Sequence, residues 1–171
     1  VQLSSFIGRE EEMKQIKELL RQSRLLTIVG SGGAGKTRLA MQTGADMIDD
    51  FANGVFITEL AAVSDPELIL QTLMNSVGIK EEPEISPREI VTGYLKNLEI
   101  LIIFDNCEHL VSECAEIAEF LLRRCPGLKI ITTSRESLNC PGEYTYRAPS
   151  LSLPDKSEYN SPEKLAQCEA V

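Results

Sequence analysis

One stretch of small residues constrains the fold of this chain more than any other. Residues 27–40 read TIVGSGGAGKTRLA, with an apolar run before the glycines and a helix-like pattern after them. Small residues contribute little to packing, but they let backbone N–H groups converge on an anion without side chains intervening. A helix that starts at the end of such a loop adds its unpaired N–H groups and the positive end of its dipole. The stretch therefore predicts a phosphate-binding turn between a strand and a helix.

The loop matches the P-loop pattern G-x-x-x-x-G-K-[ST]. Its eight residues are Gly30, Ser31, Gly32, Gly33, Ala34, Gly35, Lys36 and Thr37. In this pattern the backbone cradles the phosphates, the lysine reaches the terminal phosphates, and the threonine hydroxyl binds Mg²⁺. Average composition produces the pattern by chance on the order of 1% of the time in such a chain. A flexible glycine-rich turn is therefore the weaker interpretation, and we expect a nucleotide with Mg²⁺ here.

An acidic residue ends the most hydrophobic segment, LEILIIFD at 98–105. A P-loop needs an acid on a neighbouring strand to hold the metal, so Asp105 is expected to hold Mg²⁺ together with Thr37, either by direct coordination or through another ligand of the ion. Asn106 stands where many hydrolysing ATPases carry a glutamate, and its amide cannot accept a proton. Glu108 is the nearest carboxylate. The sequence leaves open whether Glu108 orients water or only complements a helix N-terminus.

Polar residues end a second apolar segment, LKIITTSR at 128–135. Thr132, Thr133 and Ser134 are polar where a buried strand normally stays apolar, which suggests contact with bound water or phosphate. Arg135 is a candidate γ-phosphate ligand because its guanidinium fork suits three equatorial oxygens. The alternative is a surface arginine that follows a strand.

Predicted helices and strands alternate along the chain. Helices are expected over 9–21, 35–50, 64–78 and 86–98 and between 110 and 124, and strands over 24–29, 54–60, 98–105, 128–135 and 143–151. The central strands are apolar on both faces, which indicates an α/β fold with a mostly parallel sheet and helices on both sides.

Capping residues mark two of the expected helix starts. Asp65 or Ser64 can cap the helix over 64–78, with Pro66 in its first turn. Ser86 and Glu89 have the spacing of a capping box.

Composition excludes several classes of protein. The chain has 171 residues, enough for one domain, and a net charge of −9. This charge disfavours direct binding of nucleic acid or an anionic membrane, because both need a basic surface. No apolar run approaches the roughly 18 residues that span a bilayer, and no export signal is recognisable. The five cysteines form no C-x-x-C pair, which favours reduced thiols in a cytoplasmic protein.

Together these motifs resemble the STAND class of P-loop ATPases, signalling relatives of AAA+ proteins that include the NB-ARC domains. The similarity is greatest to the nucleotide-binding core of bacterial ATPase transcriptional regulators. The matching stretches are FIGREEEMKQI, GSGGAGKTRLA, LIIFDNCEHL, IITTSRESL and LSLPD, within residues 6–154. The resemblance implies a three-layer P-loop NTPase core with a five-stranded sheet in the order 5-1-4-3-2. The strand before Arg135 would then lie between the strands that precede Lys36 and that end at Asp105.

The resemblance also implies further site residues and a division of the chain. Ile7, Gly8 and Arg9 would pack on the adenine or at a hinge, and Arg38 joins the nucleotide-binding set without a role that its chemistry explains. The implied parts are an N-terminal linker helix with the adenine-side motif, the P-loop core, and a linker with the start of a helical domain. They cover 1–23, 24–154 and 155–171 respectively.

The expected partners are an adenine nucleotide and other domains of a longer protein. In the STAND class, helical and winged-helix domains close over the nucleotide, and 171 residues do not hold them. The chain is therefore expected to be a core of a larger protein with an output domain elsewhere. Nucleotide-dependent self-association of that full-length protein is a further expectation, without membrane contact or direct nucleic-acid binding by this segment.

Three functions compete at the sequence level. The first is an ATP/ADP switch with slow hydrolysis, in which Lys36, Asp105, Glu108 and Arg135 would carry a weak ATPase activity. The second is a small-molecule kinase or other phosphotransferase, which needs an acceptor pocket and an arginine-rich lid; no lid is recognisable. The third is a GTPase, whose N-K-x-D motif does not occur in the sequence. The switch is the expectation that agrees with Asn106.

Overall fold

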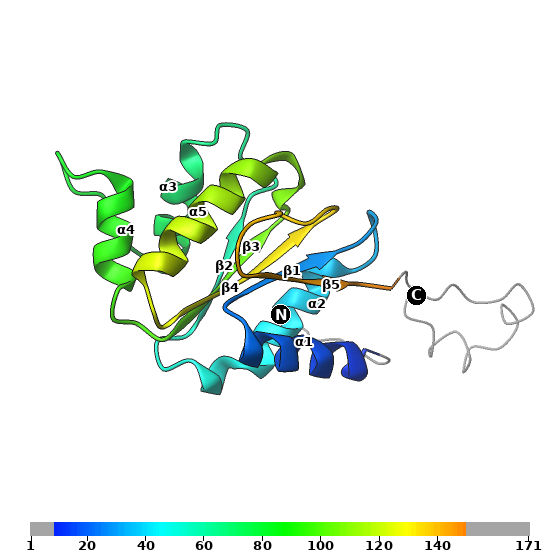
Figure 1. Cartoon of the computed structure of the whole chain (residues 1–171). Helices are drawn as coiled ribbons and strands as arrows, with labels where there is room; N and C mark the ends of the chain where they lie inside the picture. The colour runs from blue at the N-terminus through cyan, green and yellow to red at the C-terminus, as the bar shows by residue number, and fades with distance from the viewer. Residues whose placement is uncertain (1–8, 150–171) are drawn as a thin grey trace, which may run out of the picture.

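This computed structural model describes residues 9–149. They fold into a five-stranded sheet between two layers of helices (Figure 1). The helices are α1 (Glu10–Gln22), α2 (Lys36–Asp46), α3 (Leu68–Val77), α4 (Pro87–Leu95) and α5 (Val111–Arg124), with short 3-10 turns η1 (Ile48–Asp50) and η2 (Cys107–His109). The strands are β1 (Leu25–Val29), β2 (Val55–Glu59), β3 (Ile100–Asp105), β4 (Leu128–Ser134) and β5 (Glu143–Arg147).

The strand order is β2-β3-β4-β1-β5, and every neighbouring pair is parallel. This is the predicted order 5-1-4-3-2 counted from the other edge. Strand β4 lies between β1 and β3, with Thr132 paired to Thr27 on one side and to Phe104 on the other. Because the strands are parallel, the P-loop, Asp105 and the residues after β4 all meet at one edge of the sheet.

Alternate residues of the central strands supply two separate hydrophobic cores. Ile102 and Phe104 of β3 pack with α3, α4 and α5, whereas Leu101 and Ile103 pack with α1 and α2. All four side chains have no exposed surface. Burial on both faces explains the nearly continuous apolar run of β3, as parallel sheets covered by helices require. The same alternation directs the Asp105 side chain toward α2.

Three helices differ in length from their predictions, and one of them, α4, ends at Leu95 instead of residue 98. Helix α2 ends at Asp46 and a 3-10 turn follows, instead of one helix as far as residue 50. Helix α3 begins at Leu68, and Asp65 caps no helix: its Oδ1 accepts the N–H of Glu67 at 3.0 Å. This local turn satisfies the backbone before the helix starts, which is a common competing role of aspartate. The capping box of α4 is confirmed, with the Glu89 N–H donating to Ser86 Oγ at 3.3 Å.

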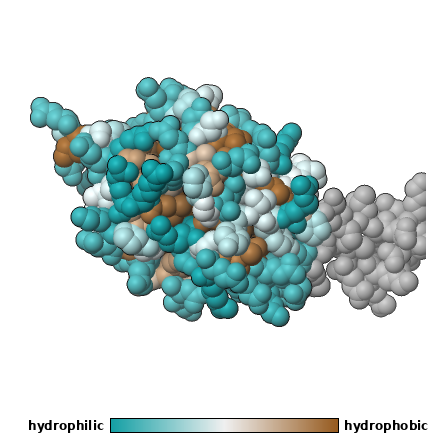
Figure 2. All heavy atoms as spheres, in the orientation of Figure 1, coloured by the Kyte–Doolittle hydropathy of each residue, from teal (hydrophilic) through white to brown (hydrophobic). Residues whose placement is uncertain are grey.

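The surface is mostly hydrophilic on the face drawn in Figure 2, with small and separate hydrophobic patches. Over the whole described molecule, the exposed large apolar side chains include Ile48, Ile85 and Tyr94. Across residues 9–149, none of the helices combines the length and the apolar character that a membrane crossing requires.

Candidate nucleotide-binding site

The P-loop is a tight turn between the end of β1 and the start of α2. Gly33 and Gly35 have φ angles of 79° and 73°, in the left-handed region that glycine adopts without strain. The Ala34 N–H donates to the Ser31 carbonyl at 3.2 Å and closes the turn. Gly35 is the N-cap of α2 and has no side chain with which to cap the helix. The first amides of α2 therefore remain available to an anion, as a phosphate cradle requires.

The glycines also permit close contacts around the loop. A Cβ atom on Gly30 would lie 3.3 Å from the Ala148 carbonyl oxygen, just beyond β5. One on Gly32 would lie 3.7 Å from Nη2 of Arg135. The segment after β5 thus packs against the start of the loop, and the Arg135 side chain lies beside its middle.

Lys36 lies across the loop and is only 7% exposed. Its Nζ donates to the carbonyl oxygens of Gly30 at 3.0 Å and of Ser31 at 3.1 Å. These acceptors are neutral, and a phosphate oxygen would form a stronger hydrogen bond because it adds a full negative charge opposite the ammonium group. The ammonium group therefore already lies within the loop, and a bound polyphosphate would offer it a stronger acceptor than these carbonyls.

Thr37 and Asp105 meet where α2 approaches the end of β3. The Thr37 hydroxyl donates to Oδ1 of Asp105 at 2.8 Å, and Asp105 is 5% exposed. A hydroxyl and a carboxylate are the hard oxygen donors that Mg²⁺ prefers. These two residues, 68 positions apart in the sequence, were predicted as a pair, and the donor set fits the ion.

The polar end of β4 is buried and bonds to protein groups rather than facing outward. Thr132 Oγ1 lies 2.7 Å from Thr27 Oγ1, and Ser134 Oγ accepts the N–H of Glu136 at 3.3 Å. Thr133 donates to Oδ1 of Asp105 at 2.6 Å. Contact with water or phosphate was the expectation from sequence. The structure instead gives each hydroxyl a protein partner, and only Thr133 touches a candidate site residue.

Arg135 and Glu108 form an ion pair that the sequence did not reveal. Nε of Arg135 lies 3.5 Å from Oε1 of Glu108, and the two side chains are 68% and 25% exposed. Oε2 of Glu108 is buried and accepts no hydrogen bond from a residue that the structure describes. Glu108 therefore binds the arginine, which neither of its two sequence-level interpretations included.

The residues around Glu108 form a short turn after β3. Asn106 has a φ of 64°, a left-handed conformation that asparagine tolerates better than most residues. His109 Nε2 lies 2.7 Å from the Val63 carbonyl oxygen, which anchors the turn to the loop after β2. A hydrogen bond with Cys114, together with burial, raises the pKa of the Cys107 thiol well above its usual value. Cys107 is therefore a protonated core residue.

Arg9 is buried against the P-loop, with 1% of its surface exposed. Its guanidinium donates to the Ala34 carbonyl oxygen and to the Pro149 carbonyl oxygen, both at 3.1 Å. It thereby links the loop to the segment after β5. Arg38 is exposed in the first turn of α2. Ile7 and Gly8, the other residues of the predicted adenine-side motif, lie outside the described residues.

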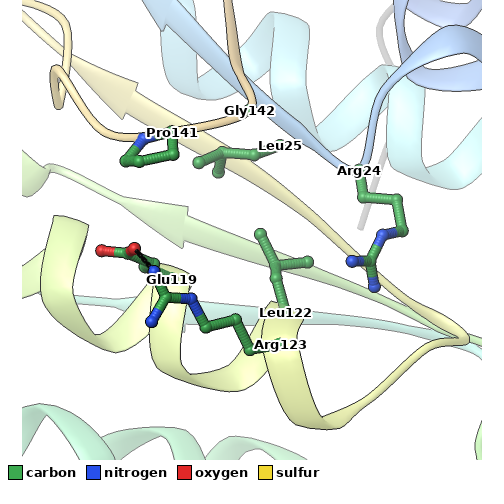
Figure 3. A pocket seen from close by; sticks show the side chains of 7 residues that line it. All are labelled: Arg24, Leu25, Glu119, Leu122, Arg123, Pro141 and Gly142. Carbon is green, nitrogen blue, oxygen red and sulfur yellow. Dashed lines mark hydrogen bonds and ion pairs between the residues drawn. The ribbon is translucent and has the colours of Figure 1, made fainter.

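A separate pocket of about 350 Å³ lies at the opposite ends of the strands (Figure 3). It is lined by Arg24 and Leu25 at the start of β1, by Glu119, Leu122 and Arg123 of α5, and by Pro141 and Gly142 before β5. Glu119 and Arg123 pair with each other across one turn of α5. Among the predicted site residues that the structure describes, none lines this pocket, so we do not include it in the candidate site.

Comparison with known proteins found no matching family model. An uncharacterized protein of Mycobacterium tuberculosis is 40% identical over 151 residues, which cover 88% of this chain and 38% of the relative. A second protein of that organism, named as a candidate HTH-type transcriptional regulator, is 37% identical over 83% of this chain and 16% of its own length. The chain thus spans well under half the length of these relatives.

Solved structures share the fold at low sequence identity. Cdc6p from Pyrobaculum aerophilum superposes with a TM-score of 0.65 and 15% identity, over 85% of this chain and 46% of that one. This chain has the P-loop NTPase fold. A STAND protein with a tetratricopeptide repeat sensor, from Pyrococcus horikoshii, gives a TM-score of 0.59 and 19% identity over 98% of this chain and 28% of its own.

Proposed function

We propose that this chain is an ATP/ADP-binding, Mg²⁺-dependent switch domain of a larger signalling or transcription-regulatory ATPase. The observation that carries the proposal is the 2.8 Å hydrogen bond between Thr37 and Asp105 beside the P-loop. It joins the two residues that a P-loop ATPase uses to hold its metal. Similarity to a candidate transcriptional regulator favours the regulatory setting.

Each site residue has a defined part in this proposal. The amides of residues 31–37 would bind the phosphates, and Lys36 would exchange the Gly30 and Ser31 carbonyls for phosphate oxygens. Thr37 and Asp105 would hold Mg²⁺, which neutralises phosphate charge. The exposed Arg135 guanidinium, beside Gly32, would bind the γ-phosphate, which ATP carries and ADP lacks. Arg9, Arg38 and the motif at Ile7 and Gly8 would complete the nucleotide site.

Slow hydrolysis follows from the residues after Asp105. Asn106 offers an amide in place of a general base, and Oε1 of Glu108 is engaged by Arg135 at 3.5 Å. A nucleotide site without a well-placed base retains ATP long enough to hold one arrangement of domains, and ADP would favour another. The weak ATPase activity would then reset the switch.

The proposed partners lie in the rest of the longer protein. Helical, winged-helix and output domains would respond to the nucleotide, and the full-length protein would self-associate in one nucleotide state. The net charge of −9 supports DNA contact by another domain rather than by this one. We place the protein in the cytoplasm, where ATP and reduced thiols are both present.

Equilibrium binding tests the nucleotide part of the proposal. Fluorescent ATP, ADP and GTP analogues are titrated into the chain with Mg²⁺ and again with EDTA. The proposal expects both adenine nucleotides to bind, GTP to bind more weakly, and Mg²⁺ to strengthen ATP binding. Equal affinity for all three, or no binding at all, would contradict it.

Turnover separates a switch from a metabolic enzyme. Phosphate release from ATP is measured on this chain and on the longer protein. We expect a rate well below the enzyme median of about 10 per second. Rapid phosphoryl transfer to a small-molecule acceptor would instead favour the kinase alternative.

A further inference from the structure

Thr133 occupies the centre of a hydrogen-bond chain that ends on the carboxylate of Asp105. We infer that Thr133 is a positioning residue for the Mg²⁺ site, which it serves by fixing the orientation of Asp105. The inference rests on the proposed function, since it presumes that Asp105 helps to bind the ion. It adds a residue to the site that neither the P-loop pattern nor the acid at the end of β3 identifies.

The direction of the chain follows from its donors. The Asn106 N–H donates to Thr133 Oγ1 at 2.9 Å, and Thr133 Oγ1 lies 2.6 Å from Asp105 Oδ1. A hydroxyl has one hydrogen to donate, and a carboxylate can only accept. Because the N–H already occupies an acceptor position on Thr133, the hydroxyl hydrogen is directed to Asp105.

Two hydroxyls hold the same carboxylate oxygen from opposite elements. Thr37 reaches Oδ1 of Asp105 from α2 at 2.8 Å, and Thr133 reaches it from β4 at 2.6 Å. Neither bond uses Oδ2. Thr37 is itself a predicted Mg²⁺ ligand, so only the bond from Thr133 can fix the carboxylate independently of the metal.

Burial makes this arrangement rigid. Thr133 has no exposed surface, and Asp105 is only 5% exposed. A hydroxyl buried without partners would be destabilising, so its bonds to Asp105 and Asn106 are strongly favoured over alternatives. Thr133 pairs with Ile28 of β1, and the preceding Thr132 also pairs with Phe104 of β3, which leaves the Thr133 backbone little freedom to move.

A purely structural role is the competing explanation. In that case Thr133 serves only to satisfy the Asn106 N–H, and its loss would lower stability without altering the metal. The two explanations differ in the Mg²⁺ dependence of nucleotide binding. Stability alone does not separate them.

The test replaces the hydroxyl with a methyl group of similar size, in Thr133→Val. ATP affinity is measured by titration in EDTA and across a series of Mg²⁺ concentrations. Loss of a hydrogen bond to a charged group should raise the half-effective Mg²⁺ concentration by about tenfold or more. Affinity in EDTA should stay within about twofold of the original chain, because the P-loop amides are untouched.

Two further variants control for packing and for a buried hydroxyl in general. Thr133→Ser keeps the donor and should restore the original Mg²⁺ dependence. Thr132→Val removes the neighbouring buried hydroxyl, which bonds to Thr27 and not to Asp105, and should leave the Mg²⁺ dependence unchanged. If the valine variant melts below the assay temperature, Thr133→Ala provides the same comparison.

The possible failures are distinguishable. If the original chain shows no Mg²⁺-dependent ATP binding, the proposed function itself is wrong. If the original chain responds to Mg²⁺ and Thr133→Val responds at the same concentration, Thr133 is only structural and the inference fails. An equal shift in Thr132→Val would also overturn it, because the effect would then belong to packing of the strand.

Discussion

The guanidinium of Arg135 lies between a glutamate and the phosphate loop: its Nε is 3.5 Å from Glu108 Oε1, and its Nη2 is 3.7 Å from the position of a Cβ on Gly32. One cation thus contacts an acid that belongs to the turn after β3 and faces a loop built for anions. Glu108 and a terminal phosphate would compete for the same group. Under the proposed function, this competition would give the site a means to distinguish ATP from ADP.

Replacing Arg135 with alanine should reduce ATP affinity much more than ADP affinity. A charge-assisted hydrogen bond contributes about 1.5–3 kcal/mol, so the ATP-to-ADP affinity ratio should fall by about tenfold or more. The comparison is made by competitive titration with Mg²⁺. Arg123→Ala is the matched control. Arg123 forms a similar ion pair with Glu119, but it lies in the last turn of α5, beside the separate pocket and not at the candidate site. Equal losses for the two nucleotides would exclude a γ-phosphate role for Arg135.

Replacing Glu108 with glutamine should have the opposite effect. The variant keeps the shape of the side chain and removes the charge that holds Arg135. ATP should then bind more tightly relative to ADP, by a modest factor because Arg135 is largely exposed and ion pairs of exposed groups are weak. If Glu108→Gln instead lowers ATP affinity, as Arg135→Ala is expected to do, Glu108 assists ATP binding and does not compete with the phosphate.

Two helical glycines should respond to alanine with opposite signs. Alanine is favoured over glycine within a helix by about 1 kcal/mol. At Gly93 in α4 a Cβ meets nothing within 4 Å, so Gly93→Ala should raise the free energy of unfolding. At Gly44 in α2 the Cβ would lie 2.8 Å from Ile103 Cδ1, and overpacking costs about 1–3 kcal/mol. Gly44→Ala should therefore destabilise the fold in urea unfolding. A stabilised Gly44→Ala variant would show that α2 can move away from β3.

The ion pair between Lys17 and Asp46 should contribute a small pH-dependent stability. Lys17 Nζ lies 2.9 Å from Asp46 Oδ2, and the hydrogen bond from Lys17 lowers the pKa of Asp46 below its usual value of 3.8. Because the pKa of Asp46 is lower in the folded state than in the unfolded state, its ionised carboxylate stabilises the fold at pH values above the unfolded-state pKa. This stabilisation is lost as the pH falls through the folded-state pKa. Asp46→Asn should thus cost at most about 1 kcal/mol at pH 7 and almost nothing near pH 2. The measurement is urea unfolding at both pH values, and an equal cost at both would exclude the ion pair as the cause.

The buried cysteines should resist alkylation in the folded protein. Cys107 and Cys114 are almost fully buried, and their hydrogen bond together with burial raises the pKa of Cys107. The thiolate is the reactive form, so a raised pKa slows the reaction further. Iodoacetamide at pH 8, followed by peptide mass spectrometry, should label both thiols only in denaturant. Fast labelling of Cys107 in the native state would contradict its place in the core.

Sequence patterns predicted the architecture because they reflect local rules. The apolar runs gave the strands, and the resemblance to STAND ATPases supplied their order. The predicted start of α3 was wrong because Asp65 accepts the N–H of Glu67 in a turn instead of capping the helix. An aspartate that caps a helix and one that forms such a turn look the same in the sequence. Thr37 and Asp105 could be paired because a known motif specifies both.

Contacts between residues without a shared motif could not be predicted. Thr133 and Glu108 were each noticed as polar or acidic residues near the site. Their partners, Asp105 and Arg135, depend on the register between β3 and β4 and on the turn at Asn106, which has a left-handed backbone. A pattern of residue types contains neither quantity. For Thr133, the signal in the sequence was the run of polar residues at the end of β4. We interpreted that run as contact with water or phosphate, whereas Thr133 donates to the carboxylate of Asp105.

The proposal that the P-loop binds a triphosphate through Lys36 is best tested by thermal unfolding of the chain and of its Lys36→Ala variant, with and without Mg-ATP. Ligand at about 100 times its Kd adds about 2.7 kcal/mol of stability, which corresponds to a rise of several degrees in Tm. The account predicts this rise for the original chain and its loss in Lys36→Ala, whose folding without ligand should be little changed. An equal rise in both proteins, or none in the original chain, would contradict a P-loop that binds the triphosphate through Lys36.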